Sequence, residues 1–165
     1  MSAVRVVALV FLGSLVACAE PGESTCTVPG DLSDGGGNVN VDGTPVELAA
    51  AWMLTGTTVQ LNLTAPDSAR GTLRLIADAA GTDASVALDG TLPVTFSLGT
   101  AERGAALWYA SANGGSASAS DSAPGTLTVT GYDGTVLEAC FAFDAQGSDG
   151  TTVTLDEGAV RAAGI

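Results

Sequence analysis

Short stretches in which apolar and polar side chains alternate constrain this chain more than any other feature. In residues 59–64, 94–98 and 126–130, valine, leucine or phenylalanine occupies every second position. A period of two is the pattern of a β-strand with one buried face. Between such stretches lie the turn dipeptides Asp-Gly, at 42–43, 89–90, 133–134 and 149–150, and Asn-Gly, at 113–114. These dipeptides favour tight hairpin turns, so consecutive strands are expected to pair with each other.

The hairpins predict an all-β fold, an antiparallel sandwich or flattened barrel of about nine or ten strands. No twelve-residue stretch of the body repeats its apolar residues with helical spacing. Residues 47–54 have a helix-favouring composition, but they follow a hairpin turn directly and are predicted to be a strand. Residues 111–125 are rich in Ser, Ala and Gly, and two alternatives stay open for them: a loop, or an edge strand at 116–120.

The first 17 residues have the layout of an export signal. Residues 1–5 carry a positive charge, and residues 6–16 are mostly apolar. The sequence Leu-Val-Ala-Cys at 15–18 resembles the bacterial lipobox, whose cysteine receives a diacylglycerol before the leader is cleaved ahead of it. We therefore expect lipidation of Cys18. The alternative is an ordinary secretory signal followed by a chance cysteine.

This leader predicts three segments: a signal peptide at 1–17, a lipidated flexible tether at 18–37 and an antiparallel β domain at 38–165. The tether is expected because proline and glycine punctuate it and no apolar periodicity survives there. The predicted location is the cell envelope, and the predicted attachment is membrane lipid through Cys18. Ala19 follows the cysteine, and similarity to enteric sorting signals then implies the outer membrane, where the cell has one.

Charge and missing residue types exclude several functions. The chain has 18 Asp and Glu, five Arg, no Lys and no His. Loss of the leader removes Arg5 and leaves four Arg against the same acids, a formal charge of −14. Such a surface repels nucleic acid, because binding there depends on cations. Without His or Lys, Ser–His and Cys–His triads, Schiff-base lysines and His-rich zinc sites cannot form.

We therefore expect no enzyme, no catalytic residues and no cofactor. The predicted role is a structural or binding module, with a possible envelope protein or glycan as partner. Two alternatives stay open: a carboxylate-based hydrolase of the envelope, and a carrier of a small apolar ligand. For the hydrolase, one carboxylate lies near aromatic residues in sequence, Glu102 before Trp108 and Tyr109. Those aromatics, like Trp52, are predicted to be core or rim residues.

Cys26 and Cys140 are the cysteines that remain once Cys18 carries lipid. Outside the cytosol such a pair favours a disulfide over two free thiols. Alternation within residues 137–143 places Cys140 on the opposite side of its strand from Phe141 and Phe143. The thiol could then reach an N-terminal arm lying outside the main core.

Residues 38–43 resemble the first half of a calcium loop, with oxygen-bearing side chains at alternate positions and glycine at the sixth. However, the twelfth position is Ala49, where that loop needs a glutamate. A strand that runs into a hairpin turn explains every residue, so no metal site is predicted. Asp31 and Asp34 could add ligands to an irregular site, which leaves calcium open for residues 31–42.

Several short motifs in the body resemble a family of uncharacterised bacterial envelope lipoproteins that are rich in β structure, sandwich or lipocalin-like. They are Val-Asp-Gly-Thr at 41–44, Trp52, Gly-Thr-Leu at 71–73, Gly-Thr-Leu-Thr-Val-Thr at 125–130, Phe141 with Phe143, and Thr-Val-Thr-Leu at 152–155 with Gly158. The resemblance spans about residues 38–165 and implies an envelope lipoprotein with no catalytic residues to carry over. Members typically have glycine near positions 139–140, so Cys140 departs from the family in a way that suits an added disulfide.

Overall fold

A computed structural model describes residues 26–99, 102–110 and 115–165, which form ten strands and one short helix. The strands are β1 (Gly36–Val41), β2 (Thr44–Thr55), β3 (Thr58–Thr64), β4 (Arg70–Leu75), β5 (Val94–Leu98), β6 (Gly104–Ala110), β7 (Gly115–Ser118), β8 (Gly125–Tyr132), β9 (Val136–Gly147) and β10 (Thr152–Gly164). The helix is α1 (Ala84–Leu88). The predicted all-β class is therefore confirmed.

All ten strands belong to one sheet that closes on itself. Strands β2, β3, β4 and β6 pair antiparallel in that order, and β7 joins β6 to β9. Strand β9 pairs with β10 along most of its length, and the end of β10 returns to β2. This last pairing is parallel, with Ala163 opposite Ala51 and Gly164 opposite Trp52. A sheet that closes into a ring is consistent with both predicted architectures, the sandwich and the flattened barrel.

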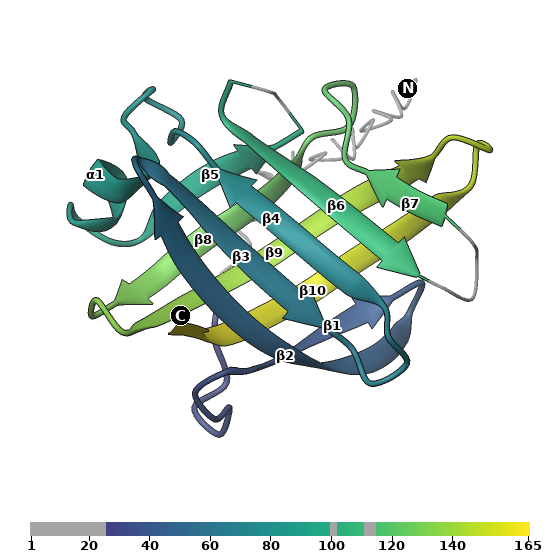
Figure 1. Cartoon of the computed structure of the whole chain (residues 1–165), viewed down its shortest axis with the longest axis horizontal. Coiled ribbons are helices and arrows are strands. Elements are labelled where there is room, and N and C mark those ends of the chain that lie inside the picture. Colours follow the sequence, from purple (N-terminus) through teal and green to yellow (C-terminus); the bar gives the residue numbers. More distant parts are fainter. Residues whose placement is uncertain (1–25, 100–101, 111–114) are drawn as a thin grey trace, which may run out of the picture.

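Two layers of the ring lie face to face. In Figure 1, β2, β3, β4 and β6 cross in front of β8, β9 and β10. We call these the front layer and the rear layer; β5 pairs with β8 and extends the rear layer. Gly99, just after β5, donates a backbone hydrogen bond to Gly104 of β6. The gap between β6 and β9 is thus bridged by β7 at one end and by β8 and β5 at the other.

Most of the predicted turns hold, and one is wrong. Asp42 and Gly43 have φ of 49° and 75° and connect β1 to β2, as their sequence predicts. The pairs at 133–134 and 149–150 connect β8 to β9 and β9 to β10. Asp89 and Gly90 instead end helix α1, where their N–H groups bond to carbonyls of the last turn. The pair at 113–114 lies outside the described residues.

Two ambiguous stretches are strands. Residues 47–54 lie within β2, which confirms the prediction made against their composition. Of the Ser-rich stretch, residues 115–118 form β7, shorter than the predicted 116–120. This strand is not at an edge, because Ala117 lies opposite Trp108 of β6 and Gly147 of β9.

The β domain begins before the predicted boundary at residue 38. Strand β1 starts at Gly36, and Gly37 is buried against Val160. Gly35 donates its N–H to the Arg161 carbonyl at 2.7 Å and accepts one from Ala50 at 2.8 Å. Residues 26–37 are therefore part of the folded domain, while residues 18–25 of the predicted tether lie outside the described part.

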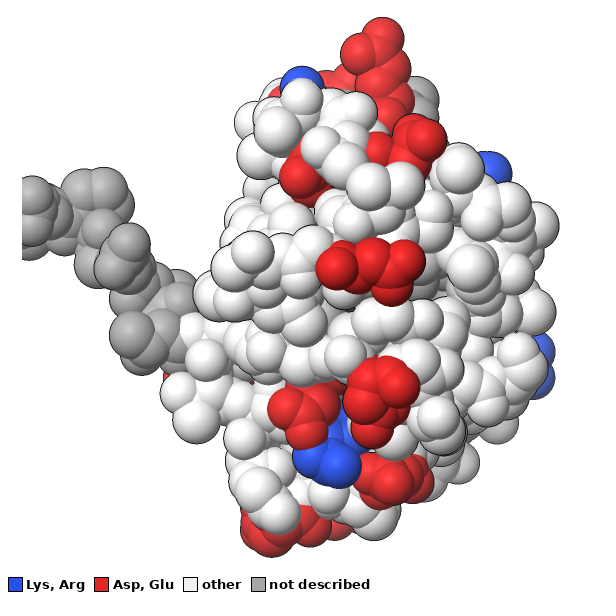
Figure 2. Space-filling view, turned by 90° about the vertical axis from the view of Figure 1, so that its left-hand side faces the viewer, with Lys and Arg blue, Asp and Glu red and all other residues white. Residues whose placement is uncertain are grey.

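Carboxylates are spread over much of the surface, as the composition requires. Figure 2 shows acidic residues scattered over one side of the molecule, with a cationic side chain enclosed by several of them. In the described part of the chain no polar or charged residue is fully buried. The core of the described part is therefore formed by apolar side chains.

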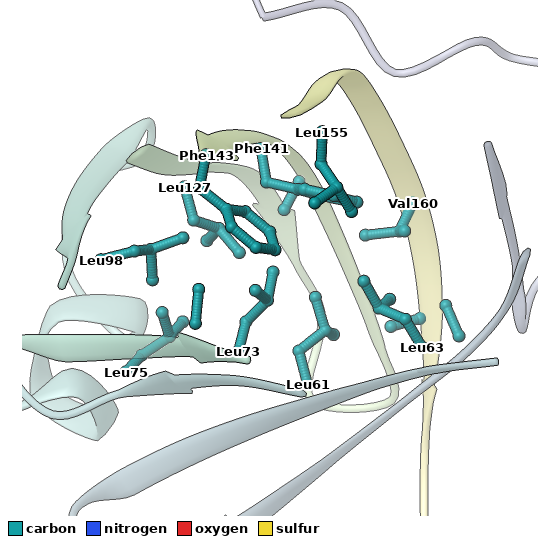
Figure 3. Packing of buried hydrophobic residues seen from close by; sticks show 14 of the residues in the cluster. Leu61, Leu63, Leu73, Leu75, Leu98, Leu127, Phe141, Phe143, Leu155 and Val160 are labelled. Carbon is teal, nitrogen blue, oxygen red and sulfur yellow. The ribbon is translucent and has the colours of Figure 1, made fainter. Parts of the chain in front are cut away.

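The core is formed by side chains that the two layers send toward each other. Figure 3 shows leucines of the front layer meeting leucine, valine and phenylalanine side chains of the rear layer. Those labelled are Leu61, Leu63, Leu73, Leu75, Leu98, Leu127, Phe141, Phe143, Leu155 and Val160, all at most 4 % exposed. Burial of each such side chain stabilises the fold by about 1.5–3 kcal/mol relative to exposure.

Candidate functional site

The two cysteines of the body form a disulfide on the outside of the rear layer. Cys26 and Cys140 are bonded, and their Cα atoms lie 5.6 Å apart. Cys140 lies between the inward-facing Ala139 and Phe141 of β9, so its side chain points outward as strand parity predicts. The Cys26 sulfur lies 3.7 Å from the Thr128 carbonyl oxygen of β8. The predicted lipidation site, Cys18, lies outside the described residues.

Arg161 holds the same N-terminal arm at a second point. Its Nη2 lies 2.8 Å from Oδ1 of Asp34, and its Nη1 forms an ion pair with Glu138 of β9. The hydrogen bond to Asp34, together with the charge of Glu138, raises the pKa of Arg161. The arm that precedes β1 is therefore fastened across β9 by the disulfide and to β10 by this ion-pair cluster.

The calcium-like residues 38–43 form a hairpin. The Asn40 amide donates to Glu157 at 2.7 Å, and Oδ1 of Asp42 accepts the Thr154 N–H at 2.9 Å. Asp34 is engaged by Arg161. Within the described ranges no three acidic or cysteine side chains gather as a metal site would require.

The aromatic residues weighed for a cleft are split between two faces. Trp108 is 2 % exposed and lies in the core, as predicted, whereas its neighbour Tyr109 is 42 % exposed on the outer face. Glu102 lies two residues before the start of β6, and that start is itself about 13 Å along the strand from Trp108. Trp52 is also buried, and its indole donates to the Thr135 carbonyl at 3.1 Å. These aromatic residues therefore do not form a cleft around Glu102.

A depression of about 220 Å³ lies where β6, β7 and the β9–β10 hairpin meet. Ser116, Asp149 and Thr151 line it, and Trp108 forms part of its base. Hydrogen bonds from the Thr151 hydroxyl and N–H lower the pKa of Asp149. Because Asp149 contributes the single carboxylate among the residues lining it, this depression lacks the acid pair of a glycosidase.

Another depression, of about 310 Å³, holds two carboxylates on the outer side of β9 and β10. Asp144 accepts a hydrogen bond from the Thr154 hydroxyl at 2.8 Å. Oδ1 of Asp156 is shielded from solvent and has no hydrogen-bond partner within the described residues. This is the arrangement that comes nearest to the two-carboxylate chemistry left open by the sequence.

A third depression, of about 190 Å³, lies beside the ion-pair cluster. Tyr132, Asp133 and Glu138 line it together with Arg161. Burial, followed by the charges of Asp89 and Asp133, raises the pKa of Tyr132. The N–H groups of Val136 and Thr135 bind the Asp133 carboxylate and lower its pKa. Asp133 thus closes the β8–β9 turn and is not available as a base.

The outer face of the front layer carries a group of exposed residues that sequence reasoning missed. Arg70 lies opposite Tyr109, and Thr72 lies opposite Leu107, in the β4–β6 pairing. Leu107 and Tyr109 are 44 % and 42 % exposed. Strands β3, β4 and β6 contain no acidic residue, and neither Arg70 nor Arg74 has an ion-pair partner in the described part.

A signal for this group was present in the sequence. Arg70 and Arg74 are four residues apart, and in a strand that spacing places both side chains on one face. Arg and Tyr are enriched among residues that dominate protein interfaces. The group of Arg70, Arg74, Leu107 and Tyr109 is called the front patch below.

The rear layer presents a different outer surface around the disulfide. Its outward residues on β5 and β8 are hydroxyl-bearing: Thr95, Ser97, Thr126, Thr128 and Thr130. The hydroxyl oxygens of Thr95 and Thr128 lie 2.9 Å apart, and Thr128 is the register partner of Cys140. Neither β5 nor β8 contains a charged residue.

No family model matches the chain, and neither curated proteins nor solved structures show a significant similarity to it. The resemblance to envelope lipoproteins therefore stays a prediction. Within the described ranges, no helix has the length and apolar character needed to cross a bilayer.

Proposed function

We propose that this chain is an exported envelope lipoprotein, anchored through lipid on Cys18, whose folded domain acts as a binding or structural module and not as an enzyme. The observation that carries the proposal is the placing of Cys18. It directly follows a leader that resembles a lipoprotein signal peptide, eight residues before a cysteine held in a disulfide.

The disulfide supports export. Disulfides form and persist in oxidising compartments and are rare in the cytosol. The Cys26–Cys140 bond closes a loop of 114 residues, and its formation requires an oxidising compartment such as the envelope. The acidic body supports covalent anchoring, because a formal charge of −14 gives no attraction to anionic lipid.

The sites that we described support binding over catalysis. Histidine and lysine are missing, and the carboxylates of Asp133 and Glu138 are engaged by backbone N–H groups and by Arg161. The front patch, by contrast, combines exposed cationic, aromatic and apolar side chains, as interface hot spots do. An envelope protein or glycan is the partner class that such a patch suits.

Lipidation is tested by expressing the full chain and its Cys18→Ser variant in a bacterial host fed with labelled palmitate. We expect the parent to be labelled, to remain with membranes and to accumulate as uncleaved precursor when lipoprotein signal peptidase is inhibited. The Cys18→Ser variant should lose the label. Cys140→Ser is the matched control, because it removes a cysteine outside the lipobox and should keep the label. Normal processing and membrane retention of Cys18→Ser would refute the anchor.

A second candidate, a carboxylate-based hydrolase, is favoured by the depression that holds Asp144 and Asp156. It is tested by measuring release of reducing ends from envelope polysaccharides by the folded domain. The binding proposal expects no release from the parent. Release that disappears in Asp156→Asn and persists in Asp149→Asn would establish the hydrolase instead.

A further inference from the structure

We propose that the Cys26–Cys140 disulfide sets the orientation of the anchored domain by holding the outer face of β5, β8 and β9 against the lipid layer. The inference rests on the proposed lipidation of Cys18. The proposed interaction surface is the hydroxyl-bearing face around the disulfide, and the proposed partner is the headgroup surface of the membrane.

The chain between the proposed lipid site and the disulfide is short. Cys26, where the disulfide fastens the chain to β9, lies eight positions after the proposed lipid site, Cys18. Whatever their conformation, eight residues span at most about 29 Å. A domain of about 140 residues has a radius of gyration of about 14 Å, which corresponds to a diameter of about 37 Å. The lipid site therefore cannot reach around the domain to the front layer.

The disulfide is what keeps this connection short. Further along the arm, the Asp34–Arg161 ion pair and the Gly35–Arg161 hydrogen bond also fasten it to β10. When the disulfide is removed and the arm opens as far as this ion pair, the connection to the lipid lengthens from eight to about sixteen residues, with a maximum span of about 58 Å. That length is comparable to half the circumference of the domain, so either layer could turn toward the membrane.

The chemistry of the face agrees with this orientation. Strands β5 and β8 present threonine and serine hydroxyls and no carboxylate. The nearby carboxylates of Glu138 and Asp34 are both paired with Arg161, whereas Asp144, outward on β9 beyond Cys140, accepts a hydrogen bond from the neutral Thr154 hydroxyl. In a chain of formal charge −14, the part of this face formed by β5 and β8 therefore adds little repulsion at an anionic headgroup surface, and its hydroxyls can donate hydrogen bonds to phosphate.

The same orientation turns the front patch away from the membrane. Arg70 and Tyr109 lie on the outer side of the front layer, across the core from the disulfide. The binding surface would then face the space in which an envelope partner is encountered.

The absence of lysine makes the orientation measurable. A single Thr95→Lys substitution on the rear face, or Thr64→Lys on the front layer, creates a unique side-chain amine at an exposed threonine. Each full-length lipidated protein is labelled with an amine-reactive donor dye. It is then reconstituted into vesicles of phosphatidylethanolamine and phosphatidylglycerol that contain a headgroup-labelled acceptor lipid. The labelled parent corrects for any reaction at the chain terminus.

With the disulfide intact, we expect about twofold higher energy transfer from position 95 than from position 64, because the two sites differ in height by about one domain diameter. In the Cys26→Ser/Cys140→Ser variant this difference should largely disappear. A variant with eight Gly and Ser residues inserted between positions 22 and 23 keeps the disulfide and should give the same loss.

Equal transfer from both positions in the oxidised parent would overturn the orientation. So would a difference that survives the insertion, because the connection length would then not be its cause. A parent that carries no lipid and does not associate with vesicles would instead refute the proposed anchor, which separates the two failures.

Discussion

The front and rear layers cover the same core with the same alternating pattern, yet their outer faces differ. The front face carries Arg70 and Arg74 beside exposed Tyr109 and Leu107. The rear face carries hydroxyls and the disulfide to the N-terminal arm. Alternation determines which residues are buried, so it makes the two layers alike inside. Outward-facing residues do not pack in the core, so the two layers can differ at these positions.

The layers also differ in how they are held. Strands β2, β3 and β4 are consecutive and pair through short turns, so their contacts are local in sequence. Strands β8, β9 and β10 of the rear layer are also consecutive and pair through hairpin turns, but this layer additionally pairs with the distant strand β1 and carries a covalent link across 114 residues. Long-range links reduce the entropy of the unfolded chain the most, so the rear layer should be more sensitive to their loss.

Removing the disulfide should have the largest effect. For Cys26→Ser/Cys140→Ser we expect the free energy of unfolding to fall by about 2–5 kcal/mol, because a closed loop of this length is released. Denaturant titration of the folded domain under oxidising and reducing conditions measures it. The far-ultraviolet circular dichroism at low temperature should remain that of a β protein.

The two layers should respond differently to removal of the disulfide. After removal of the disulfide, amide exchange should accelerate first in the N-terminal arm and β1 and least in β3 and β4. Uniform acceleration through both layers would contradict the difference in how they are held.

Added side chains at two buried glycines should have the next largest effect. A Cβ at Gly125 of β8 would lie 2.7 Å from the Ala142 carbonyl oxygen and against the Phe143 backbone, neither of which can move without bending β9. A Cβ at Gly71 of β4 would meet the ring edge of Trp108 at 2.9 Å. We expect Gly125→Ala to destabilise by about 1–3 kcal/mol and Gly71→Ala by less. Thermal unfolding compares the two, and a larger loss for Gly71→Ala would reverse the expectation.

Much of the fold was predictable because strand alternation and hairpin turns are local signals. The strands at 59–64, 94–98 and 126–130, the turn at Asp42 and Gly43, and the outward direction of Cys140 all follow from spacing of one to four residues. The disulfide follows from counting the cysteines of a chain whose leader predicts export.

The remaining features depend on distant pairings that no local pattern encodes. The closing contact of β10 with β2 is parallel and joins residues more than a hundred positions apart. Strand β7 has only four residues, and its position between β6 and β9 depends on how far apart those two strands lie. Helix α1 is too short for a periodic signal, and the Asp-Gly pair that follows it looks the same as one in a hairpin. The front patch was missed because alternation identifies the buried positions of a strand and does not indicate which outward-facing residues contribute to binding.

A pH-dependent effect should distinguish the β8–β9 turn of the rear layer from the β2–β3 turn of the front layer, which has no carboxylate. Backbone N–H groups lower the pKa of Asp133, so its charged form is favoured in the folded state. The resulting stability is present above the ordinary carboxyl pKa and is lost as the pH falls through the lowered value. Asp133→Asn should therefore be less stable than the parent near neutral pH, and the difference should shrink toward about pH 3.

Denaturant titrations at both pH values check this, with Asp149→Asn as a second case, because the pKa of Asp149 is lowered by Thr151 in the β9–β10 turn. A gap between Asp133→Asn and the parent that widens on acidification would contradict the sign.

The smallest effect on stability is expected at the front patch. Arg70 and Arg74 lie on an exposed face without an ion-pair partner in the described part of the chain, so Arg70→Ala/Arg74→Ala should change the free energy of unfolding by no more than about 0.5 kcal/mol. Arg161→Ala is the matched control, because it leaves the carboxylates of Asp34 and Glu138 without their cation and releases the arm. The thermal unfolding temperature should therefore fall for Arg161→Ala and change little for Arg70→Ala/Arg74→Ala. If the double variant lost as much stability as Arg161→Ala, the front arginines would be structural and the patch would no longer be a candidate binding surface. Unchanged stability leaves partner binding as the property that these exposed cations can serve.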